Sequence, residues 1–250
     1  MTEKRKLFPA CLTGNALKFI AIFTMLIDHI GAALIEYGIL CSYDIDRMMI
    51  IIETEEGMRW YLFDLVLRLI GRIAFPIFCF LLVEGFLHTR DERKYARNLL
   101  LFAFISEIPF DTAFFGSPFY LGAQNVYFTL FIGVVMMCFL KKYEGRQGMQ
   151  TAVVAAACAA AFLLKSDYSY FGILIIASLY LLRNRRSKRF ITTGVLAALE
   201  SLPLFGTAAL SLIPIACYNG ERGKLRIKYF FYLFYPVHIT LLIGLRYLLF

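Results

Sequence analysis

The chain has 250 residues, 60% of them hydrophobic, and a mean hydropathy of +0.68. Apolar runs recur from residue 16 to the C-terminus, which excludes an ordinary soluble domain and is typical of a polytopic membrane protein. The formal net charge is +8, but Lys and Arg occur in short clusters between the apolar runs rather than along one surface. Cytoplasmic loops of membrane proteins carry such clusters, so we expect no nucleic-acid partner.

The first apolar run, residues 16–40, contains Lys18, Asp28 and His29. It is longer than a signal-peptide core, holds charges and lacks a small-x-small cleavage signature, so we expect a retained first span. An Asp-His pair at bilayer depth is costly and needs either a structural partner or a function. The acidic segment 41–61 follows, and its apolar "MMIII" is expected to lie in the membrane interface or to re-enter.

The later apolar runs complete an all-α bundle of about nine membrane helices, with eight to ten possible, in a single integral-membrane domain over residues 1–250. They are residues 62–87, 98–115, 123–140, 150–164, 170–182, 190–204, 206–218 and 229–249. Runs 150–164, 170–182 and 206–218 fall short of the roughly 20 residues that a span needs, so they predict half-helices or tilted ones.

The basic clusters predict the orientation of the chain. Nineteen of its 26 Lys and Arg residues fall in loops on one side, including Lys4, Arg5, Lys6 and Arg226, whereas Arg47, Arg59 and Lys165 fall on the other. The positive-inside rule then predicts a multi-pass protein of the cytoplasmic membrane with its N-terminus in the cytoplasm and its C-terminus outside.

The six cysteines show no metal-like spacing, and no metal site is expected. Four of them lie in apolar runs and are expected to be buried, reduced thiols: Cys79, Cys138, Cys158 and Cys217.

Charged and polar residues recur at one depth of the predicted helices. Counting residues from the helix ends places the following near mid-membrane: Asp28, His29, Arg72, Glu107, Asp111 and His238. One such residue is often only a helix–helix hydrogen bond. Several from four helices predict a shared polar interior, as in membrane enzymes and transporters.

Helical spacing suggests partners for these residues. Arg68 and Arg72 lie four residues apart on one face, and Arg72 needs an anion, for which Asp28 and Glu107 are the candidates. Lys18 shares a face with His29 three turns away. It is expected either to meet phosphates at the cytoplasmic mouth or simply to snorkel to the interface.

The cytoplasmic end of the second helix gathers charged side chains in "VEGFLHTRDERKYARN". They are Glu84, His88, Arg90, Arg93, Lys94 and Arg97. This cluster is either ordinary positive-inside sequence or a site for a cytosolic polyphosphate ligand.

Six blocks of the sequence resemble the TraX family of membrane proteins, typified by the F-pilin acetylation protein. The blocks are "LKFIAIFTMLIDHIGA", "RLIGRIAFPIFCFLLVEGFLHTR", "KYARNLLLFAFISEIPFD", "AQNVYFTLFIGV", "SDYSYFGILII" and "YFFYLFYPVHITLL". The chain is more distantly similar to the acyltransferase-3 type of membrane acyltransferases. Those proteins have a basic residue and a His separated by ten residues, as in Lys18 and His29, although Glu84 replaces their usual Ser.

The resemblance implies transfer of an acetyl or similar group from cytosolic acetyl-CoA, as co-substrate, to an amine or hydroxyl of a membrane-associated acceptor. The acceptor is a pilin-like N-terminus, a glycan or a lipid. A transporter or proton-coupled channel with a buried Asp/Glu/Arg/His site is the alternative, and a non-catalytic scaffold is a third possibility.

On this interpretation His29 is the general base, with His238 as the second candidate. Asp28 or Glu107 would fix the tautomer of His29, and Arg72 would pair with that carboxylate or stabilise the oxyanion. The residues expected to bind acyl-CoA are Lys18, Arg68, Glu84, His88, Arg93 and Arg97.

Overall fold

A computed structural model describes residues 9–225 and 228–250, and regular structure within these ranges is helical apart from two isolated β-bridges. The predicted Lys4, Arg5, Lys6 and Arg226 clusters lie outside the described residues. The α-helices are α1 (Gly14–Ile30), α2 (Ile45–Glu53), α3 (Glu55–Gly71), α4 (Ala74–His88), α5 (Glu92–Phe115), α6 (Val126–Lys142), α7 (Gln147–Leu163), α8 (Ser169–Leu181), α9 (Arg186–Glu200), α10 (Leu212–Ala216) and α11 (Lys228–Leu249). A π-helix, η1 (Gly31–Ile39), continues α1, and two 3₁₀ segments, η2 (Leu202–Leu204) and η3 (Thr207–Ser211), precede α10.

Each predicted apolar run overlaps a helix, but the described helices differ in length. Four helical stretches are long and apolar enough to cross a membrane: Gly14–Ile39, Glu55–His88, Glu92–Phe115 and Tyr229–Leu249. Helix α8 has 13 residues, and at about 1.5 Å per residue it falls short of the roughly 30 Å hydrocarbon core. The membrane character is therefore confirmed, whereas the count of nine spans stays a prediction.

The second long stretch is broken in its middle, at Arg72 and Ile73, where α3 gives way to α4. Pro76 has no backbone N–H, so the carbonyl of Arg72, four residues earlier, lacks its usual helical partner. The proline thus accounts for a helix end beside a charged side chain. The sequence had predicted one membrane helix over 62–87.

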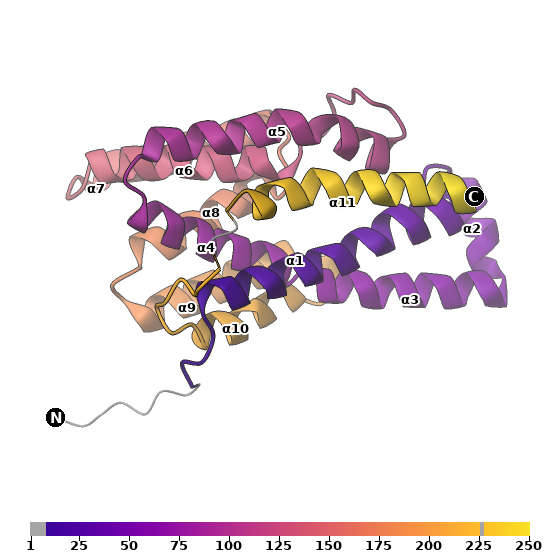
Figure 1. The fold of residues 1–250 in the computed structure, drawn as a ribbon, viewed down its shortest axis with the longest axis horizontal. Helices are drawn as coiled ribbons and strands as arrows, with labels where there is room; N and C mark the ends of the chain where they lie inside the picture. Colours follow the sequence, from indigo (N-terminus) through magenta and orange to yellow (C-terminus); the bar gives the residue numbers. More distant parts are fainter. Residues whose placement is uncertain (1–8, 226–227) are drawn as a thin grey trace.

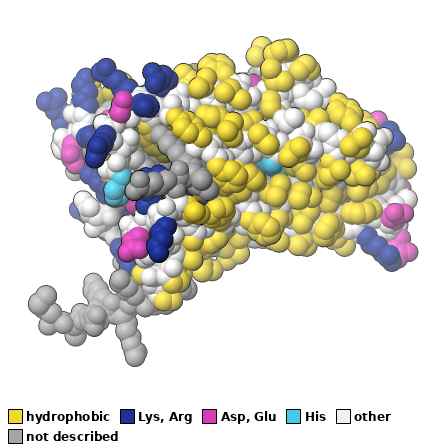
Figure 2. All heavy atoms as spheres, in the orientation of Figure 1, with side chains coloured by type: hydrophobic (Ala, Val, Ile, Leu, Met, Phe, Trp, Pro, Cys, Tyr) yellow, Lys and Arg dark blue, Asp and Glu magenta, His cyan; other side chains and the backbone are white. Residues whose placement is uncertain are grey.

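The helices run between two ends of the molecule (Figure 1). At one end Leu12 pairs with Tyr218, and ion pairs join Lys141 to Glu92 at 2.6 Å and Arg183 to Glu144 at 3.2 Å. Most Lys and Arg side chains on the visible face gather there, and a broad hydrophobic surface follows (Figure 2). We call this the basic end.

At the far end, α11 closes the last turn of α5. The Arg246 guanidinium donates to the carbonyls of Ala113 at 2.8 Å and Thr112 at 3.1 Å. Helix α5 ends there at Gly116, in the left-handed conformation with φ of 67°. The carbonyls that a helix end leaves without partners are thus satisfied by a side chain from a distant part of the chain.

The short helices α8 and α10 lie beside α4, and they extend only as far as the break between α3 and α4 (Figure 1). Tyr168, which precedes α8, stacks on Phe75 at the start of α4 with ring centroids 3.5 Å apart. The loops that precede α6 and α8 meet at the Gln124–Ser166 bridge, and Thr129 on α6 bonds Ser166 at 3.1 Å. The half of the molecule near the basic end therefore also contains the short helices, whereas the far half consists of η1, α2, α3 and the ends of α5 and α11 (Figure 1).

The predicted first span is helical throughout, but from Gly31 it continues as a π-helix. Helix α2, which contains "MMIII", has no buried residue and exposes Ile45, Met49 and Ile50. All six cysteines are free, but of the four expected to be buried only Cys79 is fully so, because the other three lie on helix faces or in a loop that neighbouring helices cover only in part.

Candidate functional site

Asp28 and His29 belong to two different polar groups, because the two side chains leave α1 in different directions. The Asp28 carboxylate accepts from Arg68 at 2.7 Å and from Arg72 at 3.1 Å, and Arg68 also pairs with Glu36 at 3.2 Å. Asp28 is buried, so this group is a desolvated ion cluster that needs both partners to remain stable. The predicted pairing of Arg72 with Asp28 is confirmed.

Two glycines let α1 and α3 approach closely enough for this cluster. A Cβ atom at Gly71 would overlap the side chain of Asp28, and one at Gly31 would lie 2.5 Å from Asp64 Oδ1. A side chain at either position would therefore push α1 away from α3. The glycines keep Asp28 within reach of both guanidinium groups.

His29 lies against His238 rather than against a carboxylate. Its Nδ1 is 2.6 Å from Nε2 of His238, the two ring planes differ by 3°, and the ring centroids are 4.9 Å apart. The centroid separation exceeds the nitrogen separation because the two nitrogens point at each other within one shared plane. On its other side, Nδ1 of His238 is 2.6 Å from the carbonyl oxygen of Phe234.

Glu107 does not join either group, contrary to the expected convergence. Its carboxylate accepts from the side-chain and backbone N–H groups of Asn125, which caps the start of α6. Asp111 accepts from the backbone N–H of Tyr120 at 2.8 Å. Glu107 and Asp111 thus hold the α5–α6 connection. Because Asp28 is bound in the ion cluster and Glu107 in this connection, neither of them orients His29.

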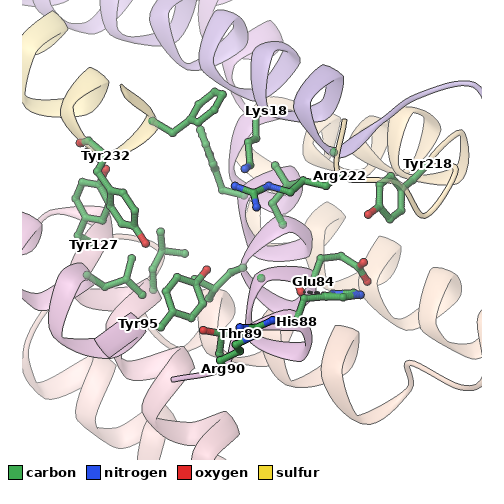
Figure 3. Close-up of a pocket in the computed structure, with 18 of the residues that line it drawn as sticks. Lys18, Glu84, His88, Thr89, Arg90, Tyr95, Tyr127, Tyr218, Arg222 and Tyr232 are labelled. Carbon is green, nitrogen blue, oxygen red and sulfur yellow. Dashed lines mark hydrogen bonds between the residues drawn. The ribbon is translucent and has the colours of Figure 1, made fainter. Parts of the chain in front are cut away.

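A cavity of about 520 Å³ lies near the basic end, between α1, α4, α5, α6 and the start of α11. Figure 3 shows Lys18, Arg222, His88 and Arg90 around it, with Glu84 between α4 and the Tyr218 loop. His88, Arg90 and Arg222 are exposed, so they form the mouth of the cavity, and half-buried Lys18 lies deeper. Three predicted cofactor-binding residues, Lys18, Glu84 and His88, thus line one cavity.

The other predicted cofactor-binding residues do not line it. Arg93 and Arg97 are exposed on α5 and are absent from the cavity wall. Arg68 lies in the ion cluster, bound to two carboxylates. Arg93 and Arg97 belong to a basic cluster on the chain, but on α5 both side chains face solvent rather than the cavity.

Four tyrosines complete the polar wall: Tyr95, Tyr127, Tyr218 and Tyr232. Burial, and secondly the neighbouring Glu84 carboxylate, raise the pKa of Tyr218 to about 12. Tyr218 is therefore a neutral hydroxyl at physiological pH. Within the described residues no group of His, Cys, Asp and Glu side chains is arranged to hold a metal ion.

Aromatic side chains connect the cavity with the histidine pair. The ring of Tyr127, in the cavity wall, lies 5.3 Å from that of Tyr235, which lies 5.7 Å from the ring of His29. Lys18 and His29 occupy the same face of α1, as their spacing predicted. Tyr127, Tyr235 and Arg222 were not predicted as site residues; the aromatic-rich "YFFYLFYPVH" was the available signal for Tyr235, the ring next to His29.

Comparison with known proteins finds similarity along most of the chain. The family model described as "TraX protein" matches residues 13–246, which include every helix given above except the last residues of α11. Over 201 residues the chain is 30% identical to "Probable fimbrial assembly protein FimC, serogroup H1" of Dichelobacter nodosus, which covers 72% of this chain and 82% of that protein. No solved structure matches. The chain belongs to the TraX family.

Proposed function

We propose that the protein is an integral-membrane acyltransferase that moves an acetyl group from cytosolic acetyl-CoA to an amine or hydroxyl of a membrane-associated acceptor. One observation carries the proposal: edge-to-face contacts of Tyr127 and Tyr235 join a cavity with a basic mouth to a histidine pair inside the helix bundle. Cations attract the phosphates of CoA, and a neutral imidazole suits proton transfer.

The cavity would take the thioester arm of acetyl-CoA. Its volume of about 520 Å³ fits a pantetheine-sized group rather than the whole cofactor. Arg222, Arg90 and Lys18 would then contact the phosphates. Exposed Arg93 and Arg97 would meet the remaining charge outside the cavity.

The acceptor would reach His29 from the membrane side. His29 is partly exposed, whereas His238 is 5% exposed. The family and the fimbrial assembly relative favour a pilin-like membrane protein as acceptor over a glycan or a lipid.

In the proposed reaction the acceptor nitrogen or oxygen attacks the thioester carbonyl carbon while its proton moves to His29. The carbon–sulfur bond then breaks, and the leaving thiolate takes that proton back from His29 to become the CoA thiol. His29 ends the cycle neutral. Arg72, held by Asp28 in the ion cluster, is given no part in stabilising the oxyanion.

The orientation that fits this reaction puts the basic end, and with it the mouth of the cavity, in the cytoplasm. Acetyl-CoA is a cytosolic compound, and the basic loops of the described chain obey the positive-inside rule in this orientation. The N-terminus would lie inside and the C-terminus outside.

The test is transfer of labelled acetyl from acetyl-CoA to a pilin-like acceptor in proteoliposomes. We expect His29→Ala to lower turnover by about 10²-fold or more, the range of general-base catalysis. Phe23→Ala is the matched control, because Phe23 lies on the same helix and is 63% exposed. Full turnover by a folded His29→Ala protein would remove the assignment.

A binding measurement separates the proposal from a transporter. We expect millimolar acetyl-CoA to raise the thermal midpoint of the purified protein, because a ligand that binds only the folded state stabilises it. Lys18→Ala should reduce that shift. An unchanged midpoint at every acetyl-CoA concentration would favour the transporter alternative.

A further inference from the structure

We propose that His238 is a positioning residue that accepts a hydrogen bond from Nδ1–H of His29 and so leaves Nε2 of His29 as the basic nitrogen. Its catalytic meaning rests on the proposed function, but the proton arrangement itself does not. The structure offers two histidines as candidate bases, and the proposal assigns them different roles.

The first step concerns the outer nitrogen of His238. Nδ1 of His238 lies 2.6 Å from the Phe234 carbonyl oxygen, and a carbonyl can only accept a hydrogen bond. Nδ1 of His238 must therefore carry a proton. In a neutral imidazole only one nitrogen is protonated, so Nε2 of His238 is an acceptor.

The second step passes this constraint to His29. Nδ1 of His29 lies 2.6 Å from that acceptor in the plane shared by both rings. Two lone pairs would repel at this distance, so Nδ1 of His29 must be the donor. Its Nε2 then holds the free lone pair, and this is the atom that a general base needs.

The chain around His238 holds the acceptor in place. Pro236 cannot donate to the carbonyl of Tyr232, four residues earlier, and the Tyr127 hydroxyl donates to that carbonyl at 2.9 Å instead. Thr240 donates to the Pro236 carbonyl at 2.8 Å. These bonds fix the segment of α11 that presents the Phe234 carbonyl and the His238 ring.

The consequence is unusual and measurable. Both imidazoles are held as the Nδ1–H tautomer, whereas free imidazole side chains in water favour the Nε2–H form. Which tautomer a histidine adopts is set by the bond that its other nitrogen makes. Removing the acceptor at His238 should release His29 to the form favoured in water.

The experiment is ¹⁵N NMR of the protein labelled at histidine, at a pH where the rings are neutral. The chain has three histidines, and His88→Gln removes the signal of the third, so the remaining rings can be assigned. His238→Gln keeps a side-chain carbonyl that can accept from His29, and His238→Phe keeps the ring shape but no acceptor. The two variants therefore separate the hydrogen bond from packing.

We expect His29 to show a protonated Nδ1 in the wild type and in His238→Gln, and a protonated Nε2 in His238→Phe. Turnover should fall less than about tenfold in His238→Gln and by about 10²-fold or more in His238→Phe. A protonated Nε2 on His29 in the wild type, or the same tautomer in all three proteins, would overturn the inference. If the tautomers behave as expected but no variant transfers acetyl groups, the proposed function fails and the proton arrangement stands.

Discussion

Asp28 and His29 are neighbours in the sequence but face different partners, because successive residues of an α-helix point about 100° apart. Asp28 faces α3 and meets two arginines, while His29 faces α11 and meets His238. Adjacent polar residues therefore do not form a catalytic pair here. We assign Asp28 a structural role, which leads to a prediction.

Asp28→Asn should lower the free energy of unfolding by about 3–5 kcal/mol, because it leaves Arg68 and Arg72 without the charge that compensates their burial. The matched control is Glu144→Gln, which breaks an ion pair whose carboxylate side chain is 71% exposed and should cost less than about 1 kcal/mol. Unfolding of both variants in mixed micelles measures the difference. An unfolding free energy equal to that of the wild type, together with lost turnover, would make Asp28 catalytic instead.

The sequence predicted some of these partners and not others, for a physical reason. A buried arginine must find an anion, and residue spacing brought few carboxylates to the depth of Arg72, so Asp28 could be named in advance. Glu107 stands at a similar depth, but its partner is Asn125, a neutral residue that the charge pattern does not mark. Which face of α5 meets which helix is decided by packing, and one sequence does not contain that information.

At the scale of elements, the apolar runs predicted where helices occur but not how far each extends. An apolar composition indicates that a segment avoids water, but it does not show whether lipid or protein covers the segment. Helices α7 and α8 pack against each other and against α6, and α8 also packs on α4, so protein contacts alone account for part of their apolar character. The break between α3 and α4 was easier to anticipate, because a proline leaves a local chemical signal.

Gly71→Ala should destabilise the protein by about 1–3 kcal/mol, because the new methyl group would overlap Asp28 and force α1 from α3. Gly244→Ala on α11 is the matched control: its methyl group would meet no atom within 4 Å, and alanine should stabilise the helix by up to about 1 kcal/mol. Unfolding transitions of the two variants in the same detergent provide the measurement. Equal midpoints for the two would show that the α1–α3 contact does not require glycine.

At the scale of the molecule, the two proposed substrates would approach from different directions. The cavity opens among exposed cations at the basic end (Figure 3), whereas partly exposed His29 lies three helical turns beyond Lys18 along α1. An enzyme that joins a cytosolic donor to a membrane-bound acceptor needs such an arrangement, since the donor is polar and the acceptor is held in the bilayer. The half near the basic end would then serve the donor, and the far half would be open to the acceptor.

This arrangement requires the two ends of the chain to lie on opposite sides of the membrane. The N-terminal Leu12 pairs with Tyr218 at the basic end, and Phe250 packs against Gly38 at the far end (Figure 1). We expect alkaline phosphatase fused after Phe250 to be active and green fluorescent protein at the same place to be dark. Insertion of the fluorescent protein at exposed Gly145, between α6 and α7 at the basic end, should give a bright protein. Fluorescence of both fusions would place both ends in the cytoplasm, and the cavity and the acceptor site would then need a different assignment to the two sides of the membrane.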